Sequence, residues 1–165
     1  MPETRRSRSY TWAEPRSIFT NADERTGLEI LRAMIDEALP HPPMADTLGF
    51  RLSEVSDGRA VFVSRPEEWL YNPIGVVHGG FAMTLLDSAM GVAVHTTLAR
   101  GERYTTLETK VNFVRAITLD TGGVRCEGTI VHRGRRVATA EGRLVDSDGK
   151  LLAHGTTTCL VEPAP

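Results

Sequence analysis

Four residues of this chain combine types and spacing that could do chemistry: His78, Gly79, Gly80 and Asp87. Gly79 and Gly80 lack a Cβ atom, so another group can approach their backbone closely. If a helix begins there, its first amide N–H groups have no intrahelical partners, and the positive end of the helix dipole suits an oxyanion. Asp87 adds a carboxylate that could act as a base or a nucleophile.

The segment after the glycines predicts a long buried helix. From Phe81 to Leu98 there is no proline, the only glycine is Gly91, and apolar side chains cover nearly every side. A helix that is apolar all round is a buried one. Asp87 carries its only formal charge, and burying an unpaired carboxylate is costly, so we expect a catalytic role for it. The alternative is a structural acid that the backbone or a partner chain satisfies.

The spacing of Gly79 and Asp87 constrains how they could cooperate. Eight residues separate them, which is roughly 12 Å along a helix at about 1.5 Å per residue. One small reacting group cannot touch both on the same helix. If both take part, the spacing predicts a composite site at which two such helices face each other across a dimer interface.

Composition sets the outer bounds. The chain has 165 residues and a net charge of −2, so it is long enough for a real core and has no basic surplus typical of nucleic-acid binding. Cys126 and Cys159 show no metal or redox spacing, which favours reduced thiols in a cytoplasmic protein. The N-terminus lacks the apolar segment of a secretory signal. The uncharged run 69–86 is interrupted by Asn72, Pro73 and three glycines, so no membrane span is expected.

Three parts follow along the chain. Residues 1–25 are polar and rich in arginine, and we expect a poorly ordered arm. Residues 26–43 hold a helix over 27–39, which begins with a Thr26–Glu29 capping box, and then a proline-rich linker. Residues 44–165 form the main domain. Its predicted strands, the last four in a meander after the central helix, are 48–56, 59–65, 104–115, 122–133, 136–147 and 150–161.

This order of elements and one motif resemble a known family. The motif is Asn72-x-x-Gly75-x-x-His78-Gly79-Gly80 with Asp87 nine residues after the histidine, and the strand sequence KVNFVRAI follows later. Together they resemble the hotdog-fold acyl-CoA thioesterases, in the PaaI-like, phenylacetate-pathway branch of the 4-hydroxybenzoyl-CoA thioesterase superfamily, over residues 44–161. The resemblance implies an α+β hotdog fold, in which an antiparallel sheet of about six strands wraps one long helix. It also implies homodimers that pair into homotetramers.

The resemblance implies roles for the motif residues. Asp87 matches the family's carboxylate, which acts as general base on water or as nucleophile at the thioester carbonyl. Gly79 matches the glycine whose backbone N–H stabilises the oxyanion. Asn72 resembles the side chain that holds the water or the thioester, from the subunit opposite Asp87. From the residues alone, however, Asn72 before Pro73 is an ordinary turn residue.

Further residues are expected to bind or support the substrate. His78 matches a histidine that props the loop and contacts the substrate or the Asn; a purely structural bond to the loop is the alternative. Thr106 aligns with a hydroxyl that helps place the water, and Gly80 allows close approach. An arginine cluster at a predicted hairpin turn could meet the phosphates of coenzyme A, or could be a solvated turn: Arg133, Arg135 and Arg136.

The expected function is therefore hydrolysis of an aryl- or short- to medium-chain acyl-CoA, without a metal or redox cofactor. An acyl-carrier-protein thioester is an alternative substrate. A hydratase is disfavoured because Val92 occupies the place of the second catalytic residue, a histidine, in those relatives. A non-catalytic acyl-CoA-binding or sensing protein is the alternative function. Ala116 stands where the family usually has proline, which bears on the local shape of the strand rather than on the chemistry.

Overall fold

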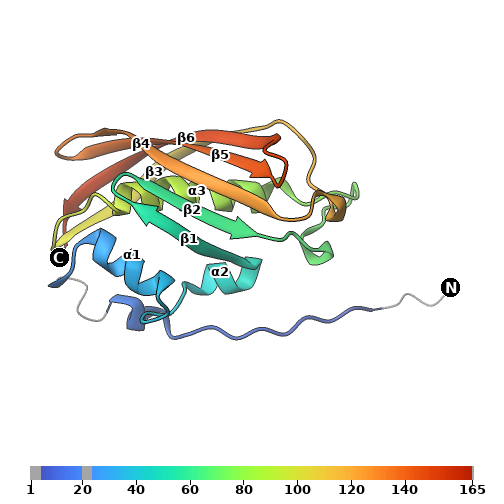
Figure 1. Cartoon of the computed structure of the whole chain (residues 1–165), viewed down its shortest axis with the longest axis horizontal. Helices are drawn as coiled ribbons and strands as arrows, with labels where there is room; N and C mark the ends of the chain where they lie inside the picture. The colour runs from blue at the N-terminus through green and yellow to red at the C-terminus, as the bar shows by residue number, and fades with distance from the viewer. Residues whose placement is uncertain (1–4, 20–23, 165) are drawn as a thin grey trace.

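A computed structural model describes residues 5–19 and 24–164 of the chain. One long helix lies against the inner face of a curved six-stranded antiparallel sheet (Figure 1). The fold is the α+β hotdog architecture expected from the sequence. Its elements are α1 (Gly27–Ile35), α2 (Pro43–Leu48), β1 (Phe50–Ser56), β2 (Arg59–Ser64), α3 (Gly79–His95), β3 (Glu102–Phe113), β4 (Val124–Arg133), β5 (Val137–Asp146) and β6 (Leu151–Pro163), with short 3₁₀ turns at Pro15–Phe19, Glu68–Leu70 and Leu119–Thr121.

The central helix α3 begins at Gly79, as its sequence predicts, and ends at His95. Leu85, Leu86 and Met90 are completely buried against the sheet. The helix is not buried on every side, however. Met83 is 43% exposed, and Thr84 and Asp87 on the same side are half-buried. One stripe of an apolar helix thus stays uncovered within a single chain.

Three glycines let α3 lie close to the sheet. Gly128, Gly142 and Gly155 stand opposite one another on β4, β5 and β6. A Cβ atom at Gly128 would overlap the backbone of Ala89, and one at Gly142 would lie 2.9 Å from the Met90 side chain. A Cβ atom at Gly155 would lie 2.6 Å from the Lys110 carbonyl oxygen on β3, so each of the three positions lacks room for a side chain.

The strand order corrects the predicted meander. The sheet runs β1-β2-β4-β5-β6-β3, so β3 pairs with β6 and not with β4. The segment from Val114 to Gly123 therefore carries the chain away from β3 instead of forming a hairpin. Only β4, β5 and β6 form a meander. Because β3 is an edge strand, its other side has no hydrogen-bonding strand among the described residues.

Two short helices precede the sheet. Thr26 and Glu29 form the predicted capping box of α1: the Glu29 N–H donates to Thr26 Oγ1, and the Thr26 N–H donates to Glu29 Oε2. The helix α2 was not predicted from the sequence, in which the prolines of this segment indicated a linker. Pro43 at the first helical position and Gly49 at the C-cap, with φ +73°, are the signals that could have found it.

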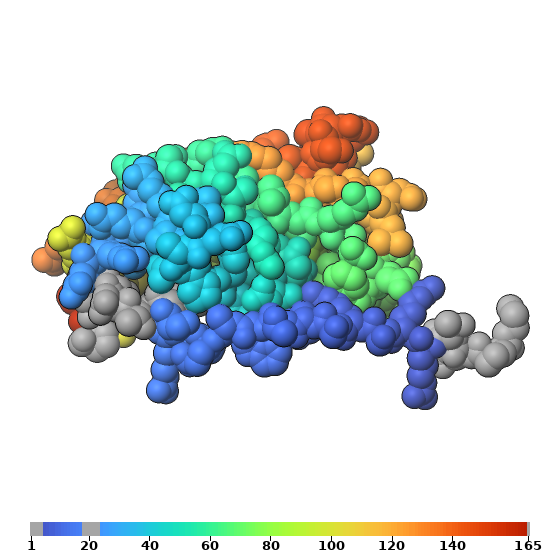
Figure 2. Space-filling view, turned by 60° about the horizontal axis from the view of Figure 1, so that its bottom comes forward, coloured from blue at the N-terminus to red at the C-terminus, as the bar shows by residue number. Residues whose placement is uncertain are grey.

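Residues 5–14 lie along the outside of the molecule, over α2 and the turn before the Asn72 loop (Figure 2). The Arg8 guanidinium lies 4.2 Å from the centroid of the Trp69 ring and donates hydrogen bonds to the carbonyl groups of Asp46 and Thr47. The prediction of a poorly ordered arm over 1–25 remains a prediction; residues 1–4 and 20–23 lie outside the described part.

Candidate active site

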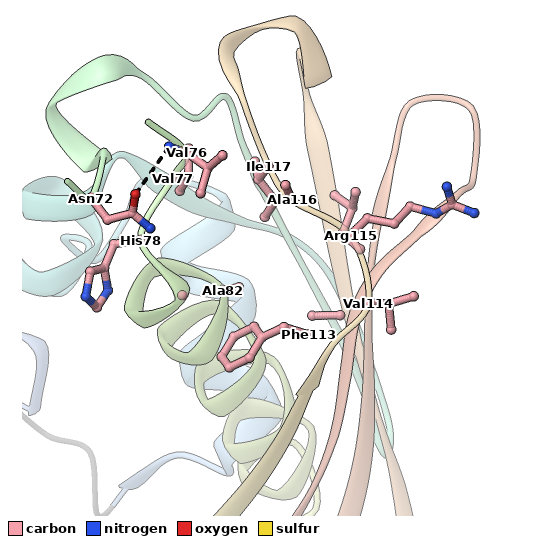
Figure 3. A pocket seen from close by; sticks show the side chains of 13 residues that line it. Asn72, Val76, Val77, His78, Ala82, Phe113, Val114, Arg115, Ala116 and Ile117 are labelled. Carbon is pink, nitrogen blue, oxygen red and sulfur yellow. Dashed lines mark hydrogen bonds between the residues drawn. The ribbon is translucent and has the colours of Figure 1, made fainter. Parts of the chain in front are cut away.

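A cavity of about 280 Å³ opens beside the N-terminus of α3. Its walls come from the loop 72–79, the first turn of α3, the segment 113–117 after β3, and the start of β6. Most of the lining is apolar, including Val77, Ala82, Phe113 and Ile117 (Figure 3). The polar lining side chains are few, with Asn72 and His78 at the helix end and Arg115 on the opposite side. An apolar pocket with a few polar groups is the usual design of a small-molecule site.

The backbone N–H of Gly79 is available at this cavity. Gly79 is the first residue of α3, and none of the described residues accepts a hydrogen bond from its N–H. A Cβ atom at Gly79 would lie 3.2 Å from the Phe113 ring, so glycine keeps the ring and the helix end in close contact. A backbone N–H without an acceptor, at the positive end of a helix, can donate a hydrogen bond to a carbonyl oxygen that gains negative charge.

Asn72 has a double role that only its hydrogen bonds reveal. Its Oδ1 accepts from the N–H groups of Ile74, at 3.1 Å, and Val76, at 3.2 Å, which holds the turn before α3. Because both partners are donors, the side-chain oxygen must face them, and the Nδ2 amide faces the other way. None of the described residues accepts a hydrogen bond from Nδ2. The same side chain therefore supports the loop and offers a donor.

His78 caps the helix. Its Nδ1 accepts a hydrogen bond of 2.9 Å from the Gly80 N–H. The Gly80 amide is thus already used, while that of Gly79 is not. The side chains of Asn72 and His78 lie on the same side of the cavity (Figure 3). The structure brings together Asn72, His78, Gly79 and Gly80, and gives each backbone or side-chain group a different task.

Asp87 lies about two turns further along α3 and does not line this cavity. Its Oδ1 accepts a hydrogen bond of 3.0 Å from Thr109 of β3, whose hydroxyl lies 3.2 Å from that of Thr157. No cation among residues 5–19 and 24–164 lies within salt-bridge distance of the carboxylate. Asp87 is therefore a half-buried acid that the described residues hold through one hydroxyl and no cation.

A β-bulge explains why Thr109 and not Thr106 contacts Asp87. The pairing of β3 with β6 shifts between Thr106 and Glu108, so Leu107 is an extra residue and is 59% exposed. The bulge changes the alternation of the strand and turns Thr109 towards α3. Thr106 instead pairs with Cys159 of β6. Burial raises the pKa of the Cys159 thiol, and the hydroxyls of Thr106 and Thr157 offset part of that rise. Thr109 is the residue that the sequence analysis missed, because no glycine or turn residue marks the bulge.

The arginine cluster lies at the opposite end of the sheet from the cavity. Arg133 pairs with Glu102, the first residue of β3, at 3.0 Å, and also donates to the Gly134 carbonyl group. Arg135 and Arg136 are exposed at the same hairpin. The cavity adjoins Phe113, at the other end of β3. Within one chain these arginines and the cavity do not meet, and their role in substrate binding stays a prediction.

Neither a metal site nor a membrane helix is present in the described part of the chain. Among its residues no group of three His, Cys, Asp or Glu side chains could hold a metal ion. No helix there has the length and apolar character needed to cross a membrane. The expectation of catalysis without a cofactor stays a prediction.

Known proteins share the fold and sequence features of this chain. A phenylacetic acid degradation-related protein of Ralstonia eutropha JMP134 is 31% identical, with a TM-score of 0.71 over 79% of this chain and 98% of that one. The 1,4-dihydroxy-2-naphthoyl-CoA hydrolase of Listeria monocytogenes is 24% identical over 119 residues, 72% of this chain and 95% of the hydrolase.

A further structure shares the fold at lower identity. A thioesterase protein of Streptococcus pneumoniae TIGR4, solved with coenzyme A, is 24% identical, with a TM-score of 0.63 over 70% of this chain and 88% of that one. The sequence profile of the thioesterase superfamily matches residues 74–153. That range holds the helix end, Asp87 and Thr109. By its sequence, its fold and its relatives, this chain belongs to the thioesterase superfamily.

Proposed function

We propose that this thioester hydrolase cleaves acyl-CoA, with an aryl or a short- to medium-chain acyl group, to the free acid and coenzyme A. The observation that carries the proposal is the Gly79 N–H at the N-terminus of α3, which has no hydrogen-bond acceptor among the described residues and lies beside an apolar cavity. The Listeria relative hydrolyses an aromatic acyl-CoA by its name, and the Streptococcus structure contains coenzyme A. Both support a coenzyme A thioester as the substrate class.

The helix end would bind and polarise the thioester. The carbonyl oxygen accepts a hydrogen bond from the Gly79 N–H, and the dipole of α3 favours the negative charge that develops on that oxygen. The Asn72 Nδ2 amide faces away from the loop and offers a donor to the thioester or to the attacking water. His78 keeps the first turn in place through the Gly80 N–H.

Asp87 would promote the attack on the carbonyl carbon in one of two ways. As a general base it takes a proton from water while the water oxygen bonds to the carbonyl carbon, and the C–S bond then breaks to release the thiolate. As a nucleophile it bonds to that carbon itself, the C–S bond breaks to release the coenzyme A thiolate, and water then hydrolyses the resulting anhydride to the free acid and the Asp87 carboxylate. In both routes Thr109 fixes one carboxylate oxygen and leaves the other free.

The site would be shared between two copies of the chain. Gly79 and Asp87 lie on one continuous helix, roughly 12 Å apart. The uncovered stripe of α3, which contains Met83 and Asp87, adjoins the edge strand β3 with its exposed Leu107. Apolar groups exposed in this way favour an interface. A homodimer, or a homotetramer of such dimers, would bring Asp87 of one subunit to the cavity of the other.

The first experiment measures thiol release from a panel of aryl- and aliphatic acyl-CoA thioesters by the wild type and by Asp87→Asn. Because Asn keeps an oxygen that can accept from Thr109, the variant should fold. We expect some thioesters to be hydrolysed and kcat to fall by about 100-fold or more in the variant. Saturable acyl-CoA binding without turnover, unchanged in Asp87→Asn, would overturn the proposal and favour a binding or sensing protein.

A mixed oligomer tests the shared site. Asp87→Asn and Gly79→Pro protomers are each expected to be inactive alone. If Asp87 serves the partner's cavity, each mixed dimer contains one site built from two intact halves, so co-expression restores activity. No recovery in mixed dimers that are verified by affinity tags would contradict the shared arrangement.

A further inference from the structure

Arg115 occupies the rim of the cavity. It follows β3, and the N–H groups of Val114 and Arg115 both donate to the carbonyl oxygen of Leu152, at 2.8 and 3.0 Å. These bonds fix the backbone of the segment against β6. The side chain is exposed, lies on the side of the cavity opposite Asn72 and His78, and points outward (Figure 3). The backbone of Arg115 is thus fixed at the rim, and its exposed guanidinium extends outward from there.

The Arg115 guanidinium forms no ion pair with the part of the chain that the structure describes. Over residues 5–19 and 24–164, no carboxylate lies within salt-bridge distance of its guanidinium, and no acceptor is hydrogen-bonded to it. Arg133, by contrast, is paired with Glu102. An exposed arginine beside an apolar cavity is available to a ligand.

Lys150 adds a second positive charge near this rim. Its Nζ lies 3.0 Å from Asp148. The Asp148 carboxylate, ahead of Asp146, raises the pKa of Lys150, and the positive charge of Arg115 lowers it slightly. Asp146 is occupied by the N–H groups of Asp148 and Lys150. Among the described residues, neither of these carboxylates lies within salt-bridge distance of the Arg115 guanidinium.

We propose that Arg115 anchors the phosphate groups of coenzyme A at the mouth of this cavity, a step that rests on the proposed function. A guanidinium matches phosphate with two parallel N–H···O bonds. The apolar walls between Gly79 and Arg115 suit the pantetheine arm, with the thioester at the helix end and the phosphates at the rim. This places the anchor at the cavity rather than at the distant hairpin of Arg133, Arg135 and Arg136.

The test compares three thioesters of one acyl group: acyl-CoA, acyl-dephospho-CoA and acyl-N-acetylcysteamine, which has no phosphate. In Arg115→Gln we expect the KM for acyl-CoA to rise about tenfold, which corresponds to the loss of one charge-assisted hydrogen bond. The value of kcat should change little. The kinetic constants for acyl-N-acetylcysteamine should not change. A tenfold loss that persists with acyl-dephospho-CoA assigns the contact to the diphosphate, and its absence there assigns it to the 3′-phosphate.

Arg143→Gln is the matched control. Arg143 is also exposed and without an ion pair among the described residues, but it lies on β5 between Gly142 and Leu144, which face α3, so its side chain is on the outer face of the sheet. This variant should behave like the wild type with all three thioesters. An equal effect of Arg115→Gln on all three substrates, or no effect on acyl-CoA, would overturn the proposal.

Calorimetry separates failure of this proposal from failure of the proposed function. If the wild type hydrolyses none of the three thioesters, the proposed activity is wrong, but binding of coenzyme A itself can still be measured. The anchor predicts about tenfold weaker binding by Arg115→Gln and a steeper loss of affinity with salt for the wild type than for the variant. Equal affinities of wild type and variant would contradict it.

Discussion

The two ends of α3 differ in whether their polar groups have hydrogen-bond partners. At the N-terminus the Gly79 N–H has no acceptor among the described residues and faces an apolar cavity. At the C-terminus the polar groups are used. Thr96 is 4% exposed, donates to the Ala93 carbonyl at 2.7 Å and accepts from the Gly58 N–H at 2.8 Å. The Leu98 carbonyl group accepts from the Gly27 N–H.

This difference separates chemistry from stability on one helix. Helix ends leave backbone groups without intrahelical partners, and a buried group of this kind must find another partner. At the C-terminal end the polar groups form hydrogen bonds with the β1–β2 turn and with α1, and these bonds join the helix to the rest of the fold. The N-terminal end keeps one donor free for a ligand. Changes at the first end should affect kcat, and changes at the second should affect the free energy of unfolding.

The largest effect is expected from Gly79→Pro. Proline is tolerated at the first position of a helix, and ψ of 136° at His78 suits the residue before a proline, but the substitution removes the N–H. We expect kcat to fall by about 10²–10³-fold. Gly79→Ala is the control, because it also places a Cβ atom against Phe113 but keeps the donor. If both variants lose activity equally, crowding and not the amide is responsible.

Asn72→Asp should reduce kcat by about 10- to 100-fold while the loop stays folded. A carboxylate can still accept from the N–H groups of Ile74 and Val76, but it cannot donate as Nδ2 does. The melting temperature should stay near that of the wild type, whereas Asn72→Ala should lower both. Full activity in Asn72→Asp would show that Asn72 supports the turn and that its Nδ2 donor has no part in catalysis.

At the C-terminal end, Thr96→Val should destabilise the fold by about 1–3 kcal/mol because the buried Gly58 N–H loses its acceptor. The measurement is the denaturant midpoint, read beside kcat at a temperature where the variant is folded. Thr96→Ser keeps the hydroxyl and should recover most of the stability. A loss of kcat without a loss of stability would break the division between the two ends.

The smallest effect near neutral pH comes from His95. Burial lowers its pKa from 6.5 to about 4. Between these values the unfolded chain binds the proton more readily, so stability falls as the pH drops below 6.5 and levels off near 4, by about 3 kcal/mol at most. His95→Leu, which keeps an apolar contact with Tyr104, should remove this part of the pH dependence. Identical pH profiles for the two proteins would contradict it.

Sequence reasoning recovered the parts of the fold that local patterns specify. The capping box at Thr26, the helix start at Gly79 and the strand alternation are local signals, and the structure contains each of them. It missed α2 and the pairing of β3 with β6. Strand pairing depends on contacts between distant segments, which no local period encodes.

For the site, the sequence by itself determined which groups can do chemistry: a glycine amide at a helix start, an amide side chain, and one acid two turns later. Tertiary structure decided which of them are free. Only the fold shows that the Gly80 N–H donates to His78, while the Gly79 N–H has no acceptor among the described residues. Only the fold shows that a bulge brings Thr109 to Asp87. It also places Arg115 at the cavity, without an ion pair among the described residues, and Arg133 in an ion pair at the far hairpin. The reason is physical, since residue type sets what a group can donate or accept, and packing alone sets which partner it meets.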